Sequence, residues 1–215
     1  MPDTSDAPGT HRAERGRWPV GACLMVALPL AVVLVVIGPF AERTAVWAAA
    51  VLMIFAAAVH RRVARATHRD LPPSGVRLAS IVTAAAGSML ASVIAIAAHL
   101  LGDDFAYRYV WLYSAVELPW YLKLSNVWGG DEGTLALMAA LIMLGAARAL
   151  RYRGWAFPGA ALLGAAFAAG AGVWSPFEAT PAADLARLDA QGINAHLATV
   201  WMAIHPPLIF VAFAL

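Results

Sequence analysis

The chain has 215 residues, of which 61% are hydrophobic and only 13% are charged, and its mean hydropathy is +0.70. Soluble domains carry about 25% charged residues, so this composition excludes a soluble globular protein. The net charge is only +2, and the basic residues stand beside apolar stretches, which indicates membrane topology and no nucleic-acid partner. The single cysteine, Cys23, excludes an intrachain disulfide.

Apolar stretches dominate the chain, and a helix needs about 20 such residues to cross a bilayer. Five stretches meet or approach this length, and a sixth begins near residue 202 and runs to the end of the sequence; the five are 19–39, 45–59, 78–101, 135–150 and 156–174. The pattern predicts an all-α fold, a polytopic transmembrane helical bundle of about six spans with the last one truncated.

The first apolar stretch follows three arginines, so it has two interpretations, a retained span or a signal peptide. Its apolar region is longer than the 7–15 residues of a typical signal-peptide core, which favours a retained span. We therefore expect residues 1–18 to form a cytoplasmic N-terminal tail and residues 19–215 to form the transmembrane region.

The positive charges predict the orientation of the spans. The segments 1–18, 60–77 and 148–155 hold 11 of the 15 Lys and Arg residues. Because cytoplasmic loops carry the excess of Lys and Arg, these segments are predicted to be cytoplasmic. The segments 102–134 and 175–201 are then predicted to lie outside.

Aromatic residues crowd the first outer segment. Eight rings fall between Phe105 and Trp128. They fit either an aromatic belt at headgroup depth or a surface that accepts a flat apolar ligand. Pro119 predicts a break that is followed by a short interfacial helix up to Asn126.

The stretch WGGDEGT, residues 128–134, stands at the entry of the next span. Its glycines, Gly129, Gly130 and Gly133, indicate a positive φ angle or the close approach of another group. Asp131 and Glu132 are predicted to lie in the first helical turn, where acids complement the helix dipole or cap free N–H groups. A proton relay or a hydrogen-bonded anchor is the functional alternative.

The histidines differ in their surroundings. His205 begins the sequence HPPL, and proline is favoured in the first helical turn while it disfavours the helical region for the residue before it. We therefore expect His205 at the entry of the sixth helix on the outer side, as a helix cap or as an axial ligand of haem iron. For His99 we expect only interfacial packing, for His11, His60 and His68 no specific role, and for His196 no visible partner.

Three stretches, in this order, resemble the CcmF-type cytochrome c haem lyase subunit, within the haem-handling cytochrome c assembly proteins. The stretches are DDFAYRYVWLYSAVELPWYLKLSNVWGGDEGTLAL, WSPFEATP and NAHLATVWMAIHPPLIF. In the first, Trp128, Gly129, Gly130, Glu132 and Gly133 match the family's Trp-Gly-Gly-x-Glu-Gly-Ser motif. The resemblance covers roughly residues 45–215.

The chain also departs from the family pattern. Asp131 replaces His or Gln, Thr134 replaces Ser, and Ala195 replaces a proline. The span at 19–39 is additional to the family's usual start. The family's tryptophan-rich haem-binding signature is absent, so the chain resembles an N-terminal portion and is expected to be a fragment.

The resemblance implies a function in cytochrome c-type biogenesis at the bacterial plasma (inner) membrane. Family members receive haem from a haem chaperone on the outer face and present it to apocytochrome c, together with other cytochrome c maturation membrane proteins. The cofactor would be b-type haem, transiently bound, with His205 as one candidate axial ligand to its iron. This portion alone would not be a catalytic lyase, and no catalytic residue is assigned. An ion- or proton-coupled transporter and a structural membrane subunit are the alternatives.

Overall fold

The computed structural model describes residues 18–66, 74–150, 154–186 and 199–214. Several predicted features lie outside these ranges: the tail before Trp18, residues 187–198 of the second outer segment, and the side chains His11, His68, Arg69, Arg151, Arg153 and His196.

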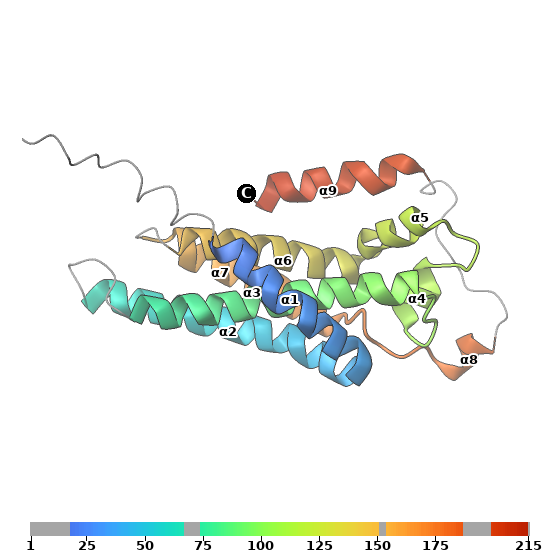
Figure 1. The fold of residues 1–215 in the computed structure, drawn as a ribbon, viewed down its shortest axis with the longest axis horizontal. Coiled ribbons are helices and arrows are strands. Elements are labelled where there is room, and N and C mark those ends of the chain that lie inside the picture. Colours follow the sequence, from blue (N-terminus) through green and yellow to red (C-terminus); the bar gives the residue numbers. More distant parts are fainter. Residues whose placement is uncertain (1–17, 67–73, 151–153, 187–198, 215) are drawn as a thin grey trace, which may run out of the picture.

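The described chain is a bundle of long helices with no strand in those ranges (Figure 1). Four helices are long and apolar enough to cross a membrane, and two further apolar helices are shorter. The long helices are α2 (Pro39–Ala66), α3 (Ser74–Leu101), α6 (Asp131–Ala149) and α7 (Ala156–Val173), and the shorter ones are α1 (Trp18–Ile37) and α9 (Val200–Ala214). The prediction of an all-α membrane helical bundle is confirmed.

The helices of the first two apolar stretches, 19–39 and 45–59, are separated in the structure by a single residue and not by the whole of segment 40–44. Gly38 alone separates α1 from α2, and its φ of 96° lies in the region that only glycine enters easily. Pro39 then occupies the first helical position, where its missing N–H is not needed. Glu42 and Arg43, which stand between the two apolar stretches in the sequence, lie inside the first turns of α2.

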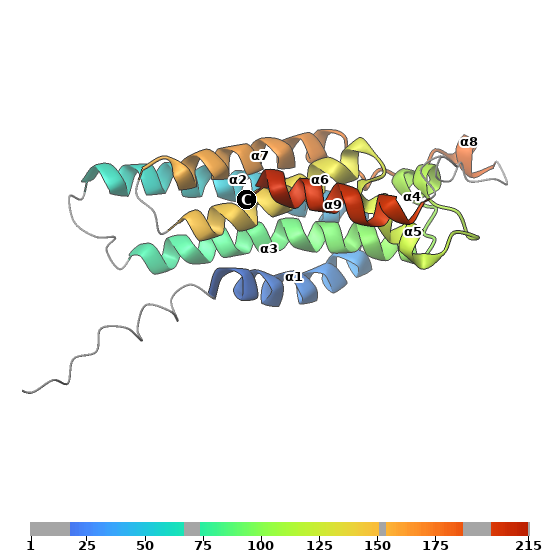
Figure 2. The same cartoon turned by 90° about the horizontal axis from the view of Figure 1, so that it is seen from above.

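Small residues let the helices approach closely. A Cβ atom on Gly87 of α3 would lie 2.8 Å from a methyl group of Val26 in α1, and one on Gly172 of α7 would lie 2.6 Å from the indole of Trp47 in α2. Alanine is the commonest residue of the buried core, and Met53, Met89 and Met143 are among its larger side chains. Interfaces of this kind are typical of helices that pack within a membrane. Helix α1 packs along α3 (Figure 2).

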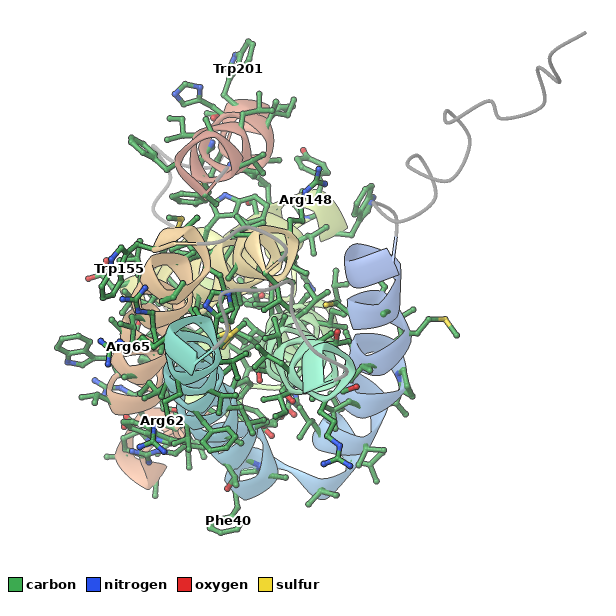
Figure 3. All side chains as sticks on the ribbon, turned by 90° about the vertical axis from the view of Figure 1, so that its left-hand side faces the viewer. Phe40, Arg62, Arg65, Arg148, Trp155 and Trp201 are labelled. Carbon is green, nitrogen blue, oxygen red and sulfur yellow. The ribbon has the colours of Figure 1, made fainter. Side chains whose placement is uncertain are left out.

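The two ends of the bundle differ in character. Arg62, Arg65 and Arg148 gather at one end, the arginine end, which faces the viewer in Figure 3. The opposite end carries residues 102–130 and 174–181, which we call the cap. The segments that the charge pattern assigns to opposite sides of a membrane therefore lie at opposite ends of the bundle.

Short elements build the cap: α4 (Arg108–Tyr113), α5 (Trp120–Ser125) and the 3-10 helix η2 (Asn126–Trp128), with α8 (Ala182–Leu185) beyond it. Tyr107 and Ala179 form an antiparallel bridge, in which Arg108 N–H donates to Glu178 O at 2.8 Å and Thr180 N–H donates to Ala106 O at 2.8 Å. These bonds join the loop after α3 to the loop after α7. The helix predicted after Pro119 is confirmed as α5.

Helix α9 lies at one side of the bundle, where it contacts α5 and α6 (Figure 1). It has no fully buried residue, and Trp201, Leu208 and Phe213 are largely exposed. Lipid or other protein surface must cover these apolar side chains in a membrane.

Candidate functional site

The WGGDEGT stretch is shaped by tyrosines of the preceding segment. The Tyr109 hydroxyl donates to Asn126 O at 2.8 Å and accepts the N–H of Gly130 at 3.1 Å. A Cβ atom on Gly133 would fall 2.3 Å from that hydroxyl and 2.1 Å from Val127 O. Residue 133 must therefore be glycine for Tyr109 to reach the backbone of η2.

Gly130 has the same role beside a second ring. A Cβ atom on Gly130 would lie 2.6 Å from the ring of Tyr113. The φ angles of Gly129 and Gly130 are −74° and −123°, so neither residue uses the positive-φ region. Of the two explanations that the sequence allowed, close approach is right and positive φ is wrong at these positions.

The two acids of the motif lie in the first turn of α6, as predicted. Gly130 is the N-cap residue, and it has no side chain that could cap this helix end. Asp131 is exposed and Glu132 is half-buried. Their position favours the helix-dipole interpretation, because carboxylates near the N-terminus offset its partial positive charge.

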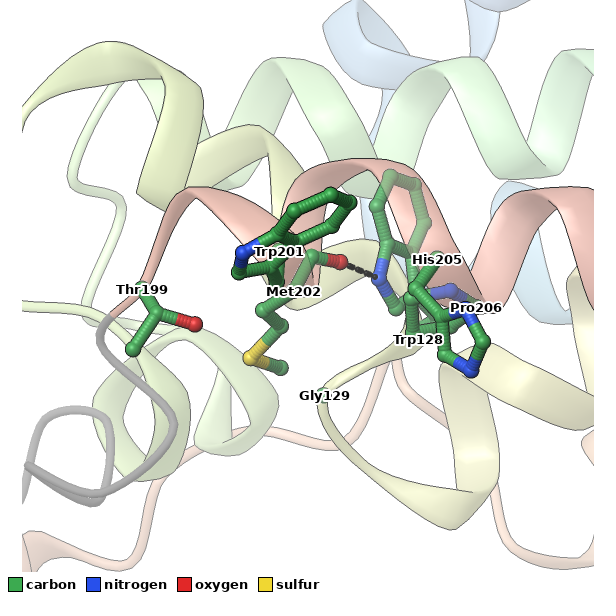
Figure 4. A pocket seen from close by; sticks show the side chains of 7 residues that line it. All are labelled: Trp128, Gly129, Thr199, Trp201, Met202, His205 and Pro206. Atoms are coloured by element: carbon green, nitrogen blue, oxygen red, sulfur yellow. Dashed lines mark hydrogen bonds between the residues drawn. The ribbon is translucent and has the colours of Figure 1, made fainter.

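Trp128 joins the motif to α9. Its indole N–H donates to Met202 O at 2.9 Å. In an uninterrupted helix this carbonyl would accept the N–H of residue 206, but Pro206 has none. The tryptophan of one motif therefore satisfies a carbonyl group that the proline of the HPP motif leaves free (Figure 4).

His205 lies in the second turn of α9, so its predicted place at the helix entry is wrong. The helix already begins at Val200 and includes both prolines, and Trp128 satisfies the carbonyl that Pro206 leaves free. The His205 side chain is exposed, and no hydrogen bond or ion pair joins its ring to another described residue. It is not a helix cap.

Trp128 and His205 line one pocket of about 650 Å³. The other lining residues are Gly129, Thr199, Trp201, Met202 and Pro206. Figure 4 shows Trp128 and His205 close together, with Trp201 farther along α9. The walls are aromatic and apolar, and the imidazole is their one titratable group. The structure thus brings together two of the motifs that the sequence singled out, whereas Glu132 and Gly133 lie outside the pocket lining.

The aromatic residues of segment 102–128 separate into groups. Tyr107, Tyr109 and Trp111 are buried within the cap, while Trp120 is 69% exposed. Most of these rings therefore build the cap itself, and Trp128 is the one that lines the pocket. Burial raises the pKa of the Tyr109 hydroxyl far above its usual value, and burial also raises the pKa of Tyr113, so both hydroxyls stay neutral.

A buried polar cluster at the junction of bundle and cap was not predicted. His99 Nε2 lies 2.6 Å from Glu42 Oε1, and His99 Nδ1 lies 3.1 Å from Asp104 Oδ2. The Tyr107 hydroxyl donates to Glu42 Oε2 at 2.9 Å, and its ring lies 4.0 Å from the His99 ring. The expectation of simple interfacial packing for His99 is wrong. A partial signal existed, since His99 is a polar residue inside the apolar stretch 78–101.

His60 also differs from expectation. Its side chain is 2% exposed and packs against Phe157 with ring centroids 5.0 Å apart. Next to it, the guanidinium carbon of Arg61 lies 3.7 Å from the centroid of a Trp155 ring, a cation–π contact. These contacts fasten α2 to the start of α7 at the arginine end.

Comparison with known proteins gives one relationship. Over 42 residues the chain is 50% identical to "Cytochrome c-type biogenesis protein CcmF" of Pseudomonas aeruginosa. The matched stretch is 20% of this chain and 6% of that protein, so it spans a small part of either. No family model matches the chain, and no solved structure matches it. The match supports a relationship to cytochrome c biogenesis through this stretch.

Proposed function

We propose that this chain is a membrane component of cytochrome c biogenesis and that it binds haem at the cap end, with His205 as one axial ligand. The observation that carries the proposal is the shared pocket of Trp128 and His205. Two motifs that are 77 residues apart in the sequence meet there, and the Trp128–Met202 hydrogen bond holds them together.

The pocket suits a flat, apolar ligand that carries a metal. Its volume of about 650 Å³ lies within the range of roughly 300–1,000 Å³ that is usual for small-molecule sites. Tryptophan and proline side chains form apolar walls, and Met202 adds a polarisable thioether. The His205 ring is exposed and has no protein partner among the described residues, so a lone pair is free for iron.

The residues have separate roles in this proposal. His205 would hold the haem iron, Trp128 would fix the register of α9 and contact the ligand, and Gly129 would keep the pocket wall free of a side chain. Bound haem would supply the group that is joined to apocytochrome c. The cap end would face outward, where a haem chaperone and other maturation proteins act, and the arginine end would face the cytoplasm of a bacterial plasma membrane.

Haem absorbance of the purified full chain tests this proposal. His205→Asn removes the imidazole but keeps a polar side chain of similar size, and we expect loss of bound haem and of its absorbance band. In His205→Gly, added imidazole should partly restore haem binding, because a small mobile ligand can occupy the vacated position. The matched control is His11→Asn, which removes a histidine before the first span and should leave the spectrum unchanged.

A His205→Asn protein that purifies with a full haem complement and an unaltered spectrum would contradict the proposal. Such a result would favour a structural subunit. The transporter alternative has less support, because the acids of the described long helices lie in or near their terminal turns and not at mid-span.

A further inference from the structure

The cluster of Glu42, His99 and Asp104 is not used by the proposed haem site. It joins α2, α3 and the loop that follows α3, and it lies where the bundle meets the cap. Ionisable groups buried at the end of a membrane span are costly unless they are paired or functional. Here both ring nitrogens of one histidine face carboxylate oxygens.

The two carboxylates have unequal access to water. Glu42 is completely buried, and its second oxygen accepts the hydroxyl of Tyr107. The side chain of Asp104 is 42% exposed. A proton on His99 Nδ1 therefore has a route to outside water through Asp104, whereas a proton on Nε2 faces the dry side of the cluster.

Hydrogen-bond chemistry links this geometry to protonation. A neutral imidazole has one N–H and can donate to only one of two carboxylates, whereas an imidazolium donates to both. When His99 releases its Nδ1 proton, that proton passes to the Asp104 carboxylate and then to water, and the ring keeps its N–H toward Glu42. The net charge of the three groups then changes from −1 to −2.

Hydrogen bonds of Asp104 and of its neighbour Asp103 join the loop after α3 to α3 and to α5. Asp104 N–H donates to His99 O at 3.1 Å, and the adjacent Asp103 accepts Lys123 Nζ of α5 at 2.7 Å. Because α5 contacts α9, the cluster is connected through the loop to the helix that carries His205.

We propose that Glu42, His99 and Asp104 form a proton-binding site that fastens the loop at residues 102–107 to the bundle. The loop is fastened when His99 carries both ring protons and is loosened when Nδ1 releases one. The site therefore makes the cap sensitive to the pH of the outer compartment. It does not depend on haem.

Few other titratable groups face the site. Tyr107 is the nearest, and burial raises the pKa of its hydroxyl far above the range in which histidine titrates, so it stays neutral. Asp103 is paired with Lys123, whose side chain is 9% exposed. Within the described contacts, His99 is the group expected to change charge near neutral pH.

Hydrogen exchange of the full chain, without haem, tests the proposal. Protection of the amides at 102–107 is measured between about pH 5 and pH 8, and each rate is corrected for the intrinsic pH dependence of exchange. We expect protection to be highest at the acidic end and to fall about tenfold per pH unit once His99 titrates. In His99→Gln, which has no titrating group, the corrected protection should not depend on pH.

The matched control is His11→Gln, the same substitution at a histidine that precedes the first apolar stretch and has no role in either proposal, and it should keep the wild-type profile. Selective ¹⁵N labelling of histidine offers a second measurement, in case His99→Gln does not fold. At about pH 5 both ring nitrogens of His99 should carry a proton. A flat wild-type profile, a pH dependence that survives in His99→Gln, or a singly protonated His99 at acidic pH would overturn the proposal. Because haem is absent, this outcome is separate from that of the haem experiment.

Discussion

At the scale of single residues, contacts explain the WGGDEGT motif better than backbone conformation does. Gly133 lies under the Tyr109 hydroxyl, and Gly130 lies against the Tyr113 ring. Both tyrosines come from α4, about twenty residues earlier in the chain. Glycine is therefore needed at these positions because the aromatic residues of α4 pack onto the start of α6.

Gly133→Ala tests this account. The added Cβ would lie 2.1 Å from Val127 O, a backbone atom that cannot move without shifting η2. Overpacking of this kind costs about 1–3 kcal/mol, so we expect a lower unfolding temperature in detergent. The matched control is Gly159→Ala in α7, where a Cβ meets no atom within 4 Å. That change should stabilise the protein by about 0.5–1 kcal/mol, since alanine favours a helix. Equal stabilisation by both changes would contradict the account.

The sequence predicts part of the site and misses part of it. Residue type and helix-breaking prolines single out His205 and Trp128, and the structure places both in one pocket. The Trp128–Met202 bond could not be foreseen, because it depends on how α9 lies against η2. Glu42 and His99 are 57 residues apart on different helices, so no local spacing marks their pairing.

At the scale of helices, the apolar stretches predict the position of every long helix that the structure describes, but α2 extends beyond its predicted stretch at both ends. The predicted spans stop where polar residues begin, yet α2 starts at Pro39 and includes Glu42. Glu42 is acceptable inside a helix because His99 and Tyr107 hydrogen-bond both of its carboxylate oxygens. Hydropathy cannot detect a charge whose partners come from a distant part of the chain.

The packing of α1 on α3 gives a prediction at this scale. Gly87→Val would place a β-branched side chain where Cβ already lies 2.8 Å from Val26, and helix packing in membranes depends on such close approach. We expect α1 to detach from α3, with reduced disulfide cross-linking between cysteines engineered into the two helices. Gly21→Val in α1 is the control, since no atom lies within 4 Å of its Cβ. Unchanged cross-linking in Gly87→Val would show that α1 does not need this contact.

At the scale of the whole molecule, the described segments rich in Lys and Arg lie at one end of the bundle, as the charge pattern predicts. Arginines gather at one end of the bundle (Figure 3). The cap at the opposite end (Figure 1) carries acidic and aromatic residues, and the pocket that contains His205 lies beside it. Successive spans run in opposite directions, so the order of the spans alone predicts that these two sets of segments lie at opposite ends. The excess of Lys and Arg predicts that the arginine end faces the cytoplasm.

Cysteine labelling of intact cells tests this orientation directly. The natural Cys23 is buried and would first be replaced by alanine, so that each variant carries one cysteine. Ala106→Cys and Ala183→Cys place a thiol at exposed positions of the cap and of α8, and Ala64→Cys places one near the arginine end of α2. A reagent that cannot cross the membrane should label the first two variants in intact cells, and should label Ala64→Cys only after the cells are opened. The reverse pattern would place His205 and its pocket on the cytoplasmic side, where delivery of haem to an external apocytochrome c is impossible. The labelling pattern therefore decides the orientation that the haem proposal requires.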